Sequence, residues 1–392
     1  MVFYHFLRGA DSGFAPDTRF HLLATYGVLG VAFFFILSGY ILVYNYAGTQ
    51  ERAQRLNPRS FWWKRFARIY PLYLFALLIC VPITVMNGVQ LHGAIGAAAR
   101  MPVTFLANLF LVHAWYWHLN GEWNGPGWSL SAEAFFYLLF PFLTRKLASI
   151  RDGGWKQAAA LSAGLLALGV VVLALVDWGL VQVDLHDNWR LAGYLRYFLL
   201  YNPLVNSTVF IMGMTLCLGE QRIRREAPRA SWWLNVVCGV IVLAGLADLA
   251  FNIPFPAVPR TAAAGIFFSA LILLGGSGGP AWLTRLLSWS PLLLLGEASY
   301  AVYLLHYPVF TYFTWIWNST GLKHYDPAAQ SNVPFYITYL AVLIGVSILS
   351  FKFLEQPARK LIQGRQPWTW RPVEKRTPPL ESAQVAAAAQ PE

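Results

Sequence analysis

The sequence predicts an all-α protein, a polytopic bundle of transmembrane helices with about ten spans and a re-entrant segment. Two observations lead to this prediction. Of the 392 residues, 57% are hydrophobic and only 12% are charged, whereas about a quarter of the residues of a soluble domain are charged. The apolar residues also gather in long blocks, and most blocks approach the roughly 20 residues that a helix needs to cross the hydrocarbon core of a bilayer.

We predict that these blocks are helices, because backbone polar groups in lipid must be satisfied within the segment and the period-2 alternation of a membrane barrel is missing. Tryptophans such as Trp62, Trp178 and Trp232 lie near the block ends, where an indole suits the membrane interface. In chain order, the predicted helices lie within residues 26–46, 69–86, 134–143, 158–176, 197–218, 232–251, 262–275, 292–317 and 335–349.

The basic residues are unevenly distributed and indicate the orientation of the helices. The net charge is +11, and most of the cations lie in residues 52–68, 145–156 and 222–229 and in the tail from residue 352. By the positive-inside rule these segments face the cytoplasm, which places the amino terminus and the carboxyl tail inside. We therefore expect the lipid bilayer as a partner and no nucleic acid.

This orientation predicts a re-entrant segment. The helix at 69–86 leaves the cytoplasm, and the helix at 134–143 must return to it at Arg145. Residues 87–127 must therefore begin and end outside. Their apolar piece, 103–117, is short for a span, so we predict that it dips into the membrane and returns. Non-helical backbone at that depth is tolerated only where it lines protein or a wet cavity.

The two ends of the chain depart from this pattern. Only Met1 to Leu7 precede Arg8, too few residues to cross a bilayer, and no cleavable signal peptide precedes them. The first helix is therefore truncated: either the chain begins with a half-helix, or the given start lies downstream of the true one. The tail is rich in Pro, Gln and Ala, which predicts a disordered cytoplasmic extension over residues 357–392 and leaves 1–356 as the transmembrane domain.

The most informative segment is 124–133, with the sequence Asn-Gly-Pro-Gly-Trp-Ser-Leu-Ser-Ala-Glu. It places an indole, two hydroxyls and a carboxylate on a Gly/Pro turn that leads into an apolar run. A carboxylate in hydrocarbon is costly, so it is kept where a cavity, a partner or chemistry needs it. Ser129 and Glu133 lie about one helical turn apart and can face one cavity.

Five separated motifs cover nearly the whole chain. They are Val-Phe-Tyr-His-Phe at 2–6, Gly-Val-Ala-Phe-Phe-Phe-Ile-Leu-Ser-Gly-Tyr at 30–40, Arg-Phe-Ala-Arg-Ile-Tyr-Pro at 65–71, Gly-Trp-Ser-Leu-Ser-Ala-Glu at 127–133 and Ala-Ser-Tyr-Ala-Val-Tyr-Leu-Leu-His at 298–306. Together, and in this order, they resemble the membrane acyltransferase-3 family, which acylates carbohydrates and related envelope molecules. The resemblance implies a core of ten helices. The first helix of that family carries an Arg, ten residues and then a His; His5 matches the His, but the Arg would fall before Met1.

His5 and Glu133 are the predicted catalytic residues. A neutral imidazole between aromatic neighbours can accept the proton of an attacking hydroxyl, and its pKa suits that task near neutrality. The alternative for His5 is an interfacial side chain that packs beside Tyr4. Glu133 can orient His5, hold it as imidazolium or bind acceptor hydroxyls. Its alternative is a helix-start carboxylate favoured by the dipole and capped by Ser129 or Ser131.

Arg65, Arg68 and Tyr70 are the predicted donor-binding residues, at the cytoplasmic start of a helix. The expected donor is acyl-CoA, which comes from the cytoplasm and carries several phosphates. Arginine forks suit phosphate oxygens better than a single point charge does. The alternative is ordinary positive-inside anchoring, which nearby cations such as Arg59 and Lys64 serve.

The predicted substrate-binding residues come from four parts of the chain. Trp128 can stack on a sugar face or anchor at the interface, and Ser129 can stabilise an oxyanion. Residues 299, 303 and 306 share a helix face and can line an acyl tunnel or the acceptor site, although packing between helices is the commoner use of Ser and Tyr in membranes. The full predicted set is Trp128, Ser129, Asn124, Ser38, Ser299, Tyr300 and His306.

These residues predict an O-acyltransferase, preferably an acetyltransferase. It would move an acyl group from cytoplasmic acyl-CoA to a hydroxyl of an envelope polysaccharide or glycolipid, in the cytoplasmic (inner) membrane of a bacterium. We expect no permanently bound cofactor and no metal, because the three cysteines lie in apolar blocks without ligand spacing. Two alternatives remain. Polar groups at membrane depth and a broken helix also suit a transporter or flippase of a sugar-linked or acylated substrate, and the missing Arg suits an inactive relative.

Overall fold

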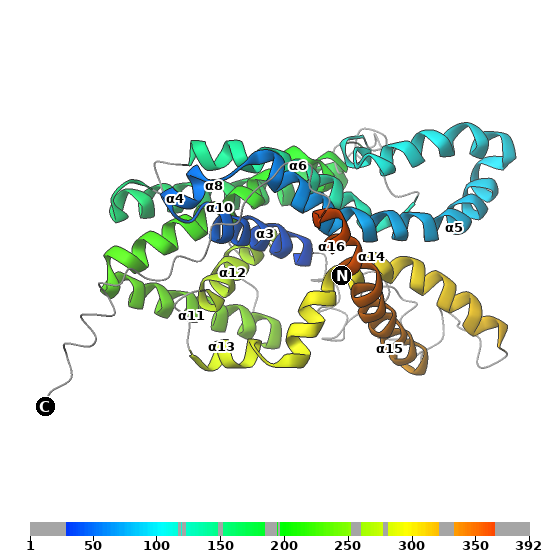
Figure 1. Ribbon diagram of the computed structural model, residues 1–392. Coiled ribbons are helices and arrows are strands. Elements are labelled where there is room, and N and C mark those ends of the chain that lie inside the picture. The colour runs from blue at the N-terminus through cyan, green and yellow to red at the C-terminus, as the bar shows by residue number, and fades with distance from the viewer. Residues whose placement is uncertain are drawn as a thin grey trace, which may run out of the picture.

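The computed structural model describes residues 29–116, 119, 123–147, 152–184, 194, 197–251, 260–276, 281–320 and 333–364. Every regular element in this part of the chain is helical, and each predicted apolar block, as far as it is described, lies in a helix. The prediction of an all-α protein is confirmed there (Figure 1). In chain order the elements are α3 (Gly30–Tyr46), α4 (Gln50–Gln54), α5 (Pro58–Leu109), η3 (His113–Trp115), η5 (Gly125–Gly127), α6 (Trp128–Lys146), α8 (Trp155–Asp184), α10 (Pro203–Glu226), α11 (Pro228–Phe251), α12 (Arg260–Gly275), α13 (Ala281–Leu287), α14 (Ser290–Ser319), α15 (Val333–Ser350), η6 (Phe351–Glu355) and α16 (Gln356–Gly364).

Four helical segments of the described chain are long and apolar enough to cross a membrane: Pro58–Leu109, Trp155–Val172, Tyr197–Glu226 and Pro334–Gly364. Three further apolar helices are shorter and cover Gly30–Tyr46, Ser231–Ala247 and Ala263–Gly275. These lengths fit a helical membrane protein. The total of about ten spans stays a prediction.

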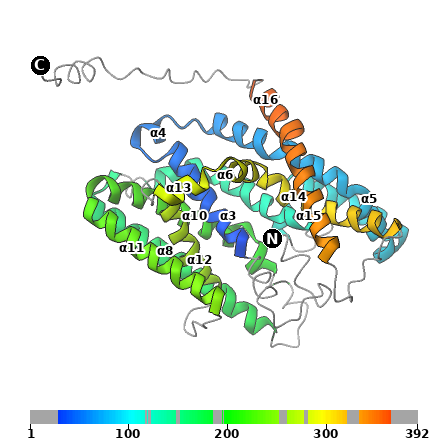
Figure 2. The same ribbon diagram turned by 90° about the horizontal axis from the view of Figure 1, so that it is seen from below.

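The helices form two groups that α6 joins (Figures 1 and 2). In one group, α10 packs against α3 and α8, and α12 packs against α11 and α8. In the other group, α14 packs against α5 and α15, and α16 packs against α5. At the junction the ring of Phe136 in α6 lies 5.0 Å from that of Phe35 in α3 and 4.9 Å from that of Phe210 in α10. All three rings are fully buried, so α6 is fixed against α3 and α10 by aromatic packing.

Two glycines let α3 and α10 touch along their backbones. A Cβ atom built on Gly39 would lie 2.1 Å from the carbonyl oxygen of Phe210, and one built on Gly213 would lie 1.9 Å from that of Ile36. Both distances are far below a van der Waals contact. Close crossings of this kind are how membrane helices associate, because packing replaces the hydrophobic driving force that is absent in lipid.

Helix α5 runs outward, turns at Gly93 and comes back, as the cyan ribbon at the right of Figure 1 shows. Gly93 has a φ of 69° inside the helix, a conformation that glycine adopts without strain. The returning part ends beside the outgoing part: the hydroxyl of Tyr70 donates to the Leu109 carbonyl at 3.1 Å, and that of Tyr73 donates to the Asn108 carbonyl at 2.8 Å. At 1.5 Å per residue, Tyr73 is roughly 22 Å along the helix from Pro58. The non-helical connection after Leu109 therefore lies beside the middle of the outgoing part of α5.

Helical structure continues into the segment for which the sequence predicts a disordered tail. Helix α16 covers Gln356–Gly364 and packs on α5. The indole nitrogen of Trp63 in α5 donates to the carbonyl of Ile362 at 3.0 Å. Residues from 365 onward lie outside the described part of the chain.

Replacing Gly213 with Ala tests the contact between α3 and α10. We expect Gly213→Ala to lower the thermal unfolding midpoint of the detergent-solubilised protein by several degrees, because overpacking of this kind costs about 1–3 kcal/mol. The control is Gly345→Ala in α15, where an added Cβ meets nothing within 4 Å, and its midpoint should stay unchanged. Equal midpoints for the two variants would contradict the backbone contact.

Candidate active site

The turn that leads into α6 is held on α14 by hydrogen bonds. The carbonyl of Pro126 accepts from the hydroxyls of Ser129, at 3.1 Å, and Tyr303, at 3.0 Å, and these two hydroxyl oxygens lie 2.7 Å apart. The side-chain amide of Asn124 donates to the carbonyl of Leu304 at 2.9 Å. Two of the predicted substrate-binding residues, Asn124 and Ser129, are thus held in place by one helix.

Trp128 lies inside the bundle, between the turn and the aromatic core. Its half-buried ring packs edge-on against Phe35 of α3, with centroids 6.0 Å apart, and against Tyr201 just before α10, with centroids 4.9 Å apart. The indole therefore belongs to a cluster of aromatic side chains near the turn and is partly exposed there.

Glu133 is a buried carboxyl group one helical turn beyond Ser129, with 4% of its surface exposed. Its Oε1 accepts hydrogen bonds from the hydroxyl of Tyr137, one turn further along α6, and from that of Ser38 in α3, at 3.4 Å. Helix α6 begins after Gly127 without a side-chain cap, and Ser129 donates to Pro126 instead. The geometry therefore does not match the alternative in which Glu133 is a capped helix-start carboxylate.

Arg65 of α5 is surrounded by aromatic rings. Its guanidinium donates to the hydroxyl of Tyr46 at 3.0 Å and lies 5.5 to 5.8 Å from the ring centroids of Tyr46, Phe61 and Tyr137. These are cation–π distances. The charge of Arg65 acts on Glu133, and Tyr137 contacts both groups, Arg65 with its ring and Glu133 with its hydroxyl.

The two other predicted donor-binding residues take different places. Arg68 is exposed, and its charge also acts on Glu133. Tyr70 binds the end of the returning part of α5, as described above, which is a structural contact. Arg65 and Arg68 are thus close to the carboxyl group, and their predicted contact with a donor stays a prediction.

The residues of the last motif, 298–306, have different roles in α14. Tyr300 donates to the carbonyl of Ile69 in α5 at 2.7 Å, and Nδ1 of buried His306 lies 2.5 Å from the carbonyl oxygen of Tyr303. Ser299 is exposed and donates to the carbonyl of Gly296 in its own helix at 2.7 Å. Among the described residues no hydrogen bond joins Ser299 to Glu133 or to the two residues that donate to it, Ser38 and Tyr137.

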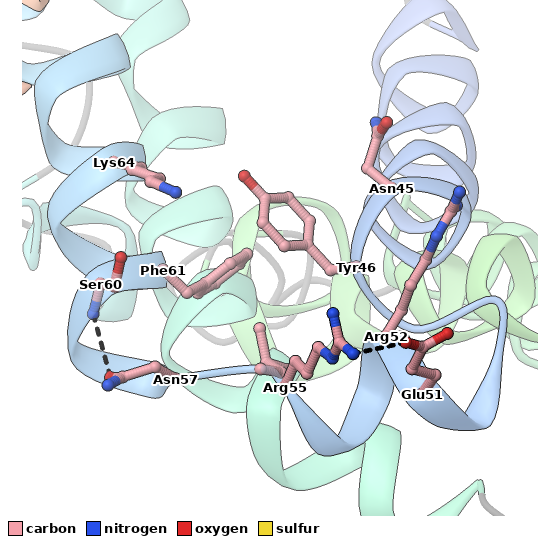
Figure 3. A pocket seen from close by; sticks show the side chains of 10 residues that line it. Asn45, Tyr46, Glu51, Arg52, Arg55, Asn57, Ser60, Phe61 and Lys64 are labelled. Atoms are coloured by element: carbon pink, nitrogen blue, oxygen red, sulfur yellow. Dashed lines mark hydrogen bonds and ion pairs between the residues drawn. The ribbon is translucent and has the colours of Figure 1, made fainter. Parts of the chain in front are cut away.

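A pocket of about 420 Å³ opens next to Tyr46, where α3, α4 and α5 meet (Figure 3). Tyr46 and Phe61 line it from the side on which Arg65 lies. The remaining lining residues are mostly polar or charged: Asn45, Glu51, Arg52, Arg55, Leu56, Asn57, Ser60 and Lys64.

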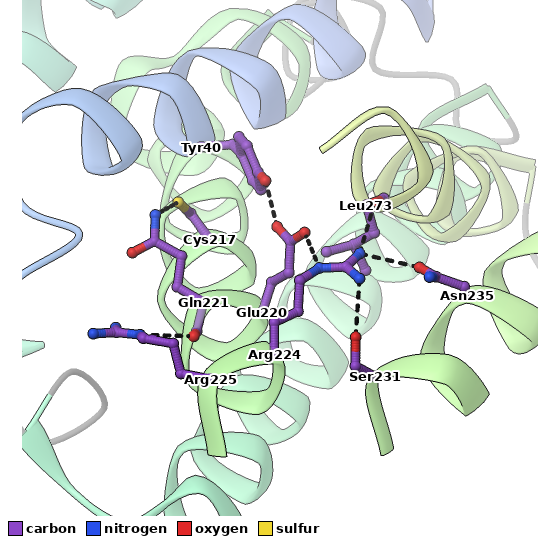
Figure 4. Close-up of polar contacts among 9 residues, drawn as sticks. All are labelled: Tyr40, Cys217, Glu220, Gln221, Arg224, Arg225, Ser231, Asn235 and Leu273. Carbon is purple, nitrogen blue, oxygen red and sulfur yellow. Dashed lines mark hydrogen bonds and ion pairs between the residues drawn. The ribbon is translucent and has the colours of Figure 1, made fainter. Parts of the chain in front are cut away.

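A buried ion pair that lies apart from Glu133 joins four helices (Figure 4). Glu220 of α10 accepts from the Tyr40 hydroxyl of α3 and from Arg224 at 2.6 Å. Arg224 also donates to Ser231 and Asn235 of α11, each at 3.0 Å, and to the Leu273 carbonyl of α12 at 3.3 Å. Since each of these charged groups has neighbours inside the protein, we assign the pair a structural role.

Sequence reasoning missed two of the tyrosines that complete the site, Tyr46 and Tyr137. Tyr137 follows Glu133 at i+4, a spacing that places two side chains on one helix face, so this signal was available. Tyr46 contacts the site from far away in the chain, and no local pattern marks it. Helical spacing does mark Tyr303, which shares a face with residues 299 and 306. His5 lies outside the described residues, and its catalytic role stays a prediction.

A family model that describes an acyltransferase domain matches residues 1–352, nearly the whole chain. The chain belongs to this acyltransferase family. The resemblance of the five motifs to an acyltransferase family is therefore confirmed.

Three relatives illustrate the range of the family. The peptidoglycan O-acetyltransferase OatA of Listeria monocytogenes is 27% identical over 352 residues, which cover 85% of this chain and 51% of the relative. The acyltransferase MdmB of Streptomyces mycarofaciens is 28% identical over 358 residues, covering 88% and 84%. The O-acetyltransferase OatA of Staphylococcus aureus is 24% identical over 365 residues, covering 87% and 54%. The chain thus spans about half the length of the OatA relatives. No solved structure matches the chain.

The charge of Glu133 can be tested with a substitution that keeps its shape. We expect Glu133→Gln to lower acyl transfer by about 10²–10⁴-fold, the range for removal of a positioned acid–base group. Radiolabel transfer by equal amounts of folded protein measures the effect. Glu297→Gln in the exposed part of α14 is the matched control and should retain activity. If the two variants were equally active, Glu133 would have no part in the reaction.

Proposed function

We propose that the protein is an O-acyltransferase that moves an acyl group, most simply acetyl, from cytoplasmic acyl-CoA to a hydroxyl of an envelope polysaccharide or glycolipid. The observation that supports it most is the buried Glu133 carboxyl group between Arg65 and the turn at Trp128 and Ser129. Two relatives are O-acetyltransferases, one of them specified for peptidoglycan, and this supports a carbohydrate acceptor.

The residues on the two sides of Glu133 suit two different substrates, the donor and the acceptor. Arg65 and the pocket beyond Tyr46 lie toward the segments that carry most of the basic residues, which the positive-inside rule assigns to the cytoplasm. Trp128 and Ser129 lie toward the opposite end of α6. A donor that enters beside Arg65 and an acceptor that enters beside Trp128 would meet at Glu133.

The proposed reaction is a direct attack on the thioester. The oxygen of the acceptor hydroxyl bonds to the carbonyl carbon, the carbon–sulfur bond breaks, and the CoA thiolate leaves. His5 takes the hydroxyl proton and returns it to the thiolate, and Glu133 stabilises the imidazolium in between. Where water is excluded, the attraction between the imidazolium and the carboxylate is stronger than it would be in water.

The same proposal places the connection between α5 and α6 within the membrane. Non-helical backbone is tolerated at that depth where protein surrounds it, and here the hydroxyl of Ser131 donates to the Leu111 carbonyl at 2.5 Å. The turn at 124–127 is fixed on α14 in the same way. In this arrangement the amino terminus and the tail are cytoplasmic, and the membrane is the inner membrane of a bacterium.

Radiolabelled acetyl-CoA supplied to vesicles that contain the protein and a polysaccharide acceptor tests the function. We expect label in the glycan and a loss of at least about 100-fold in His5→Ala, because a general base contributes about 10²–10⁴-fold. His92→Ala, at an exposed position of α5, is the matched control and should retain transfer.

Other outcomes of this experiment decide against the proposal. Glycan that crosses the membrane without acquiring label would support a transporter. Full activity of His5→Ala would remove the base assignment, and absence of label with every acceptor and acyl length would support an inactive relative.

A further inference from the structure

The pocket beside Tyr46 is built for an anion. Three of its lining residues are cations, Arg52, Arg55 and Lys64, and one is an acid, Glu51. Arg52 is oriented by a hydrogen bond of 2.7 Å from its guanidinium to the Tyr44 carbonyl. The charge balance of the described lining is therefore positive, and two of the cations are guanidinium groups, which match phosphate oxygens in a fork geometry.

The only carboxylate of this lining competes for one of the cations. Glu51 and Arg55 form an i, i+4 ion pair of 2.5 Å in which both side chains are more than half exposed (Figure 3). An exposed pair of this kind contributes little to stability. Arg55 can therefore exchange this partner for a ligand at small cost.

The inner wall of the pocket is also part of the active-site cluster. The ring of Tyr46 packs edge-on against Phe61, with centroids 5.2 Å apart, and both side chains line the pocket. The hydroxyl of Tyr46 accepts from Arg65 at 3.0 Å, and Arg65 acts in turn on Glu133. The rings of Tyr46 and Phe61 thus lie between the anion pocket and Arg65.

We propose that this pocket binds the phosphate-bearing nucleotide end of the thioester donor, with Arg52, Arg55 and Lys64 on the phosphates and the acyl arm passing Tyr46 toward Arg65 and Glu133. The volume of about 420 Å³ lies within the usual range for small-ligand sites, about 300–1,000 Å³. This inference rests on the proposed function for the identity of the donor, and it adds the residues that select it.

Anionic lipid headgroups carry the same phosphate chemistry and could occupy a cation-rich pocket at the membrane surface. A donor nucleotide differs from a lipid headgroup by an additional phosphate, which is present in coenzyme A and missing in its 3′-dephospho form. We therefore use coenzyme A and 3′-dephospho-coenzyme A as probes, with the full chain in nanodiscs of phosphatidylcholine alone and in nanodiscs that also contain phosphatidylglycerol.

The expected result is a set of opposite changes in the dissociation constant for coenzyme A. Arg52→Ala and Arg55→Ala should each weaken binding about tenfold, whereas Glu51→Gln should tighten it about threefold, because Arg55 loses its competitor. The preference for coenzyme A over its dephospho form should shrink in the double variant of Arg52 and Arg55. Arg145→Ala, exposed at the end of α6, is the matched control and should bind normally.

The direction of each change in coenzyme A binding, and its dependence on the lipid, decide between the possible outcomes. If the ion pair only supported the fold, Glu51→Gln and Arg55→Ala would change binding in the same direction, which would overturn the proposal. Unchanged binding in all variants would also overturn it. An effect of the arginine substitutions that appears only with phosphatidylglycerol present would assign the pocket to lipid.

Transfer kinetics separate this proposal from the proposed function. The arginine substitutions should raise the KM for acetyl-CoA and leave kcat nearly unchanged. If acyl transfer occurs and its KM for acetyl-CoA is unchanged by these substitutions, the proposed function stands and donor binding in the pocket is rejected. The predicted binding pattern in a protein that transfers no acyl group would retain the pocket and reject the function.

Discussion

The bundle is organised around a carboxyl group that has been removed from water. An ionised carboxyl group is costly in a low-dielectric interior unless hydrogen bonds and an opposite charge compensate it. Glu133 receives hydroxyl donors from α3 and from its own helix, and the nearby cation comes from α5. Three helices must therefore meet at this depth, and the glycine contact between α3 and α10 and the aromatic packing of α6 make that meeting possible.

The same requirement explains why so many aromatic rings surround the cation. Tyr46, Phe61 and Tyr137 enclose the guanidinium of Arg65 and keep water from screening it. Charges in such surroundings interact more strongly than charges at a surface. In the proposed reaction, exclusion of water would also suppress hydrolysis of the thioester.

Much of this arrangement follows from local features of the sequence. Apolar length predicts the helices, and a carboxylate at the edge of an apolar run predicts a functional position at Glu133, because both are properties of short segments. The contacts of Tyr46 with Arg65 and of Tyr303 with the turn before α6 join distant segments, so they depend on the packing of whole helices. Ser299 illustrates the limit: helical spacing aligns it with Tyr303, but the exposed start of α14 leaves it outside the core. The continuation of helix through α16 was equally hidden, since its contact with α5 is tertiary.

The ion pair of Glu220 and Arg224 has a consequence for how the molecule can move. It joins α3, α10, α11 and α12 at one point, and removal of either partner of such a pair typically costs about 3–5 kcal/mol. A side chain at Gly276 would also collide with it, since a Cβ there would lie 2.6 Å from the Tyr40 hydroxyl. These four helices therefore act as an anchored frame. We therefore expect any opening of the bundle to involve the other group of helices, α5, α14 and α15, which this ion pair does not hold.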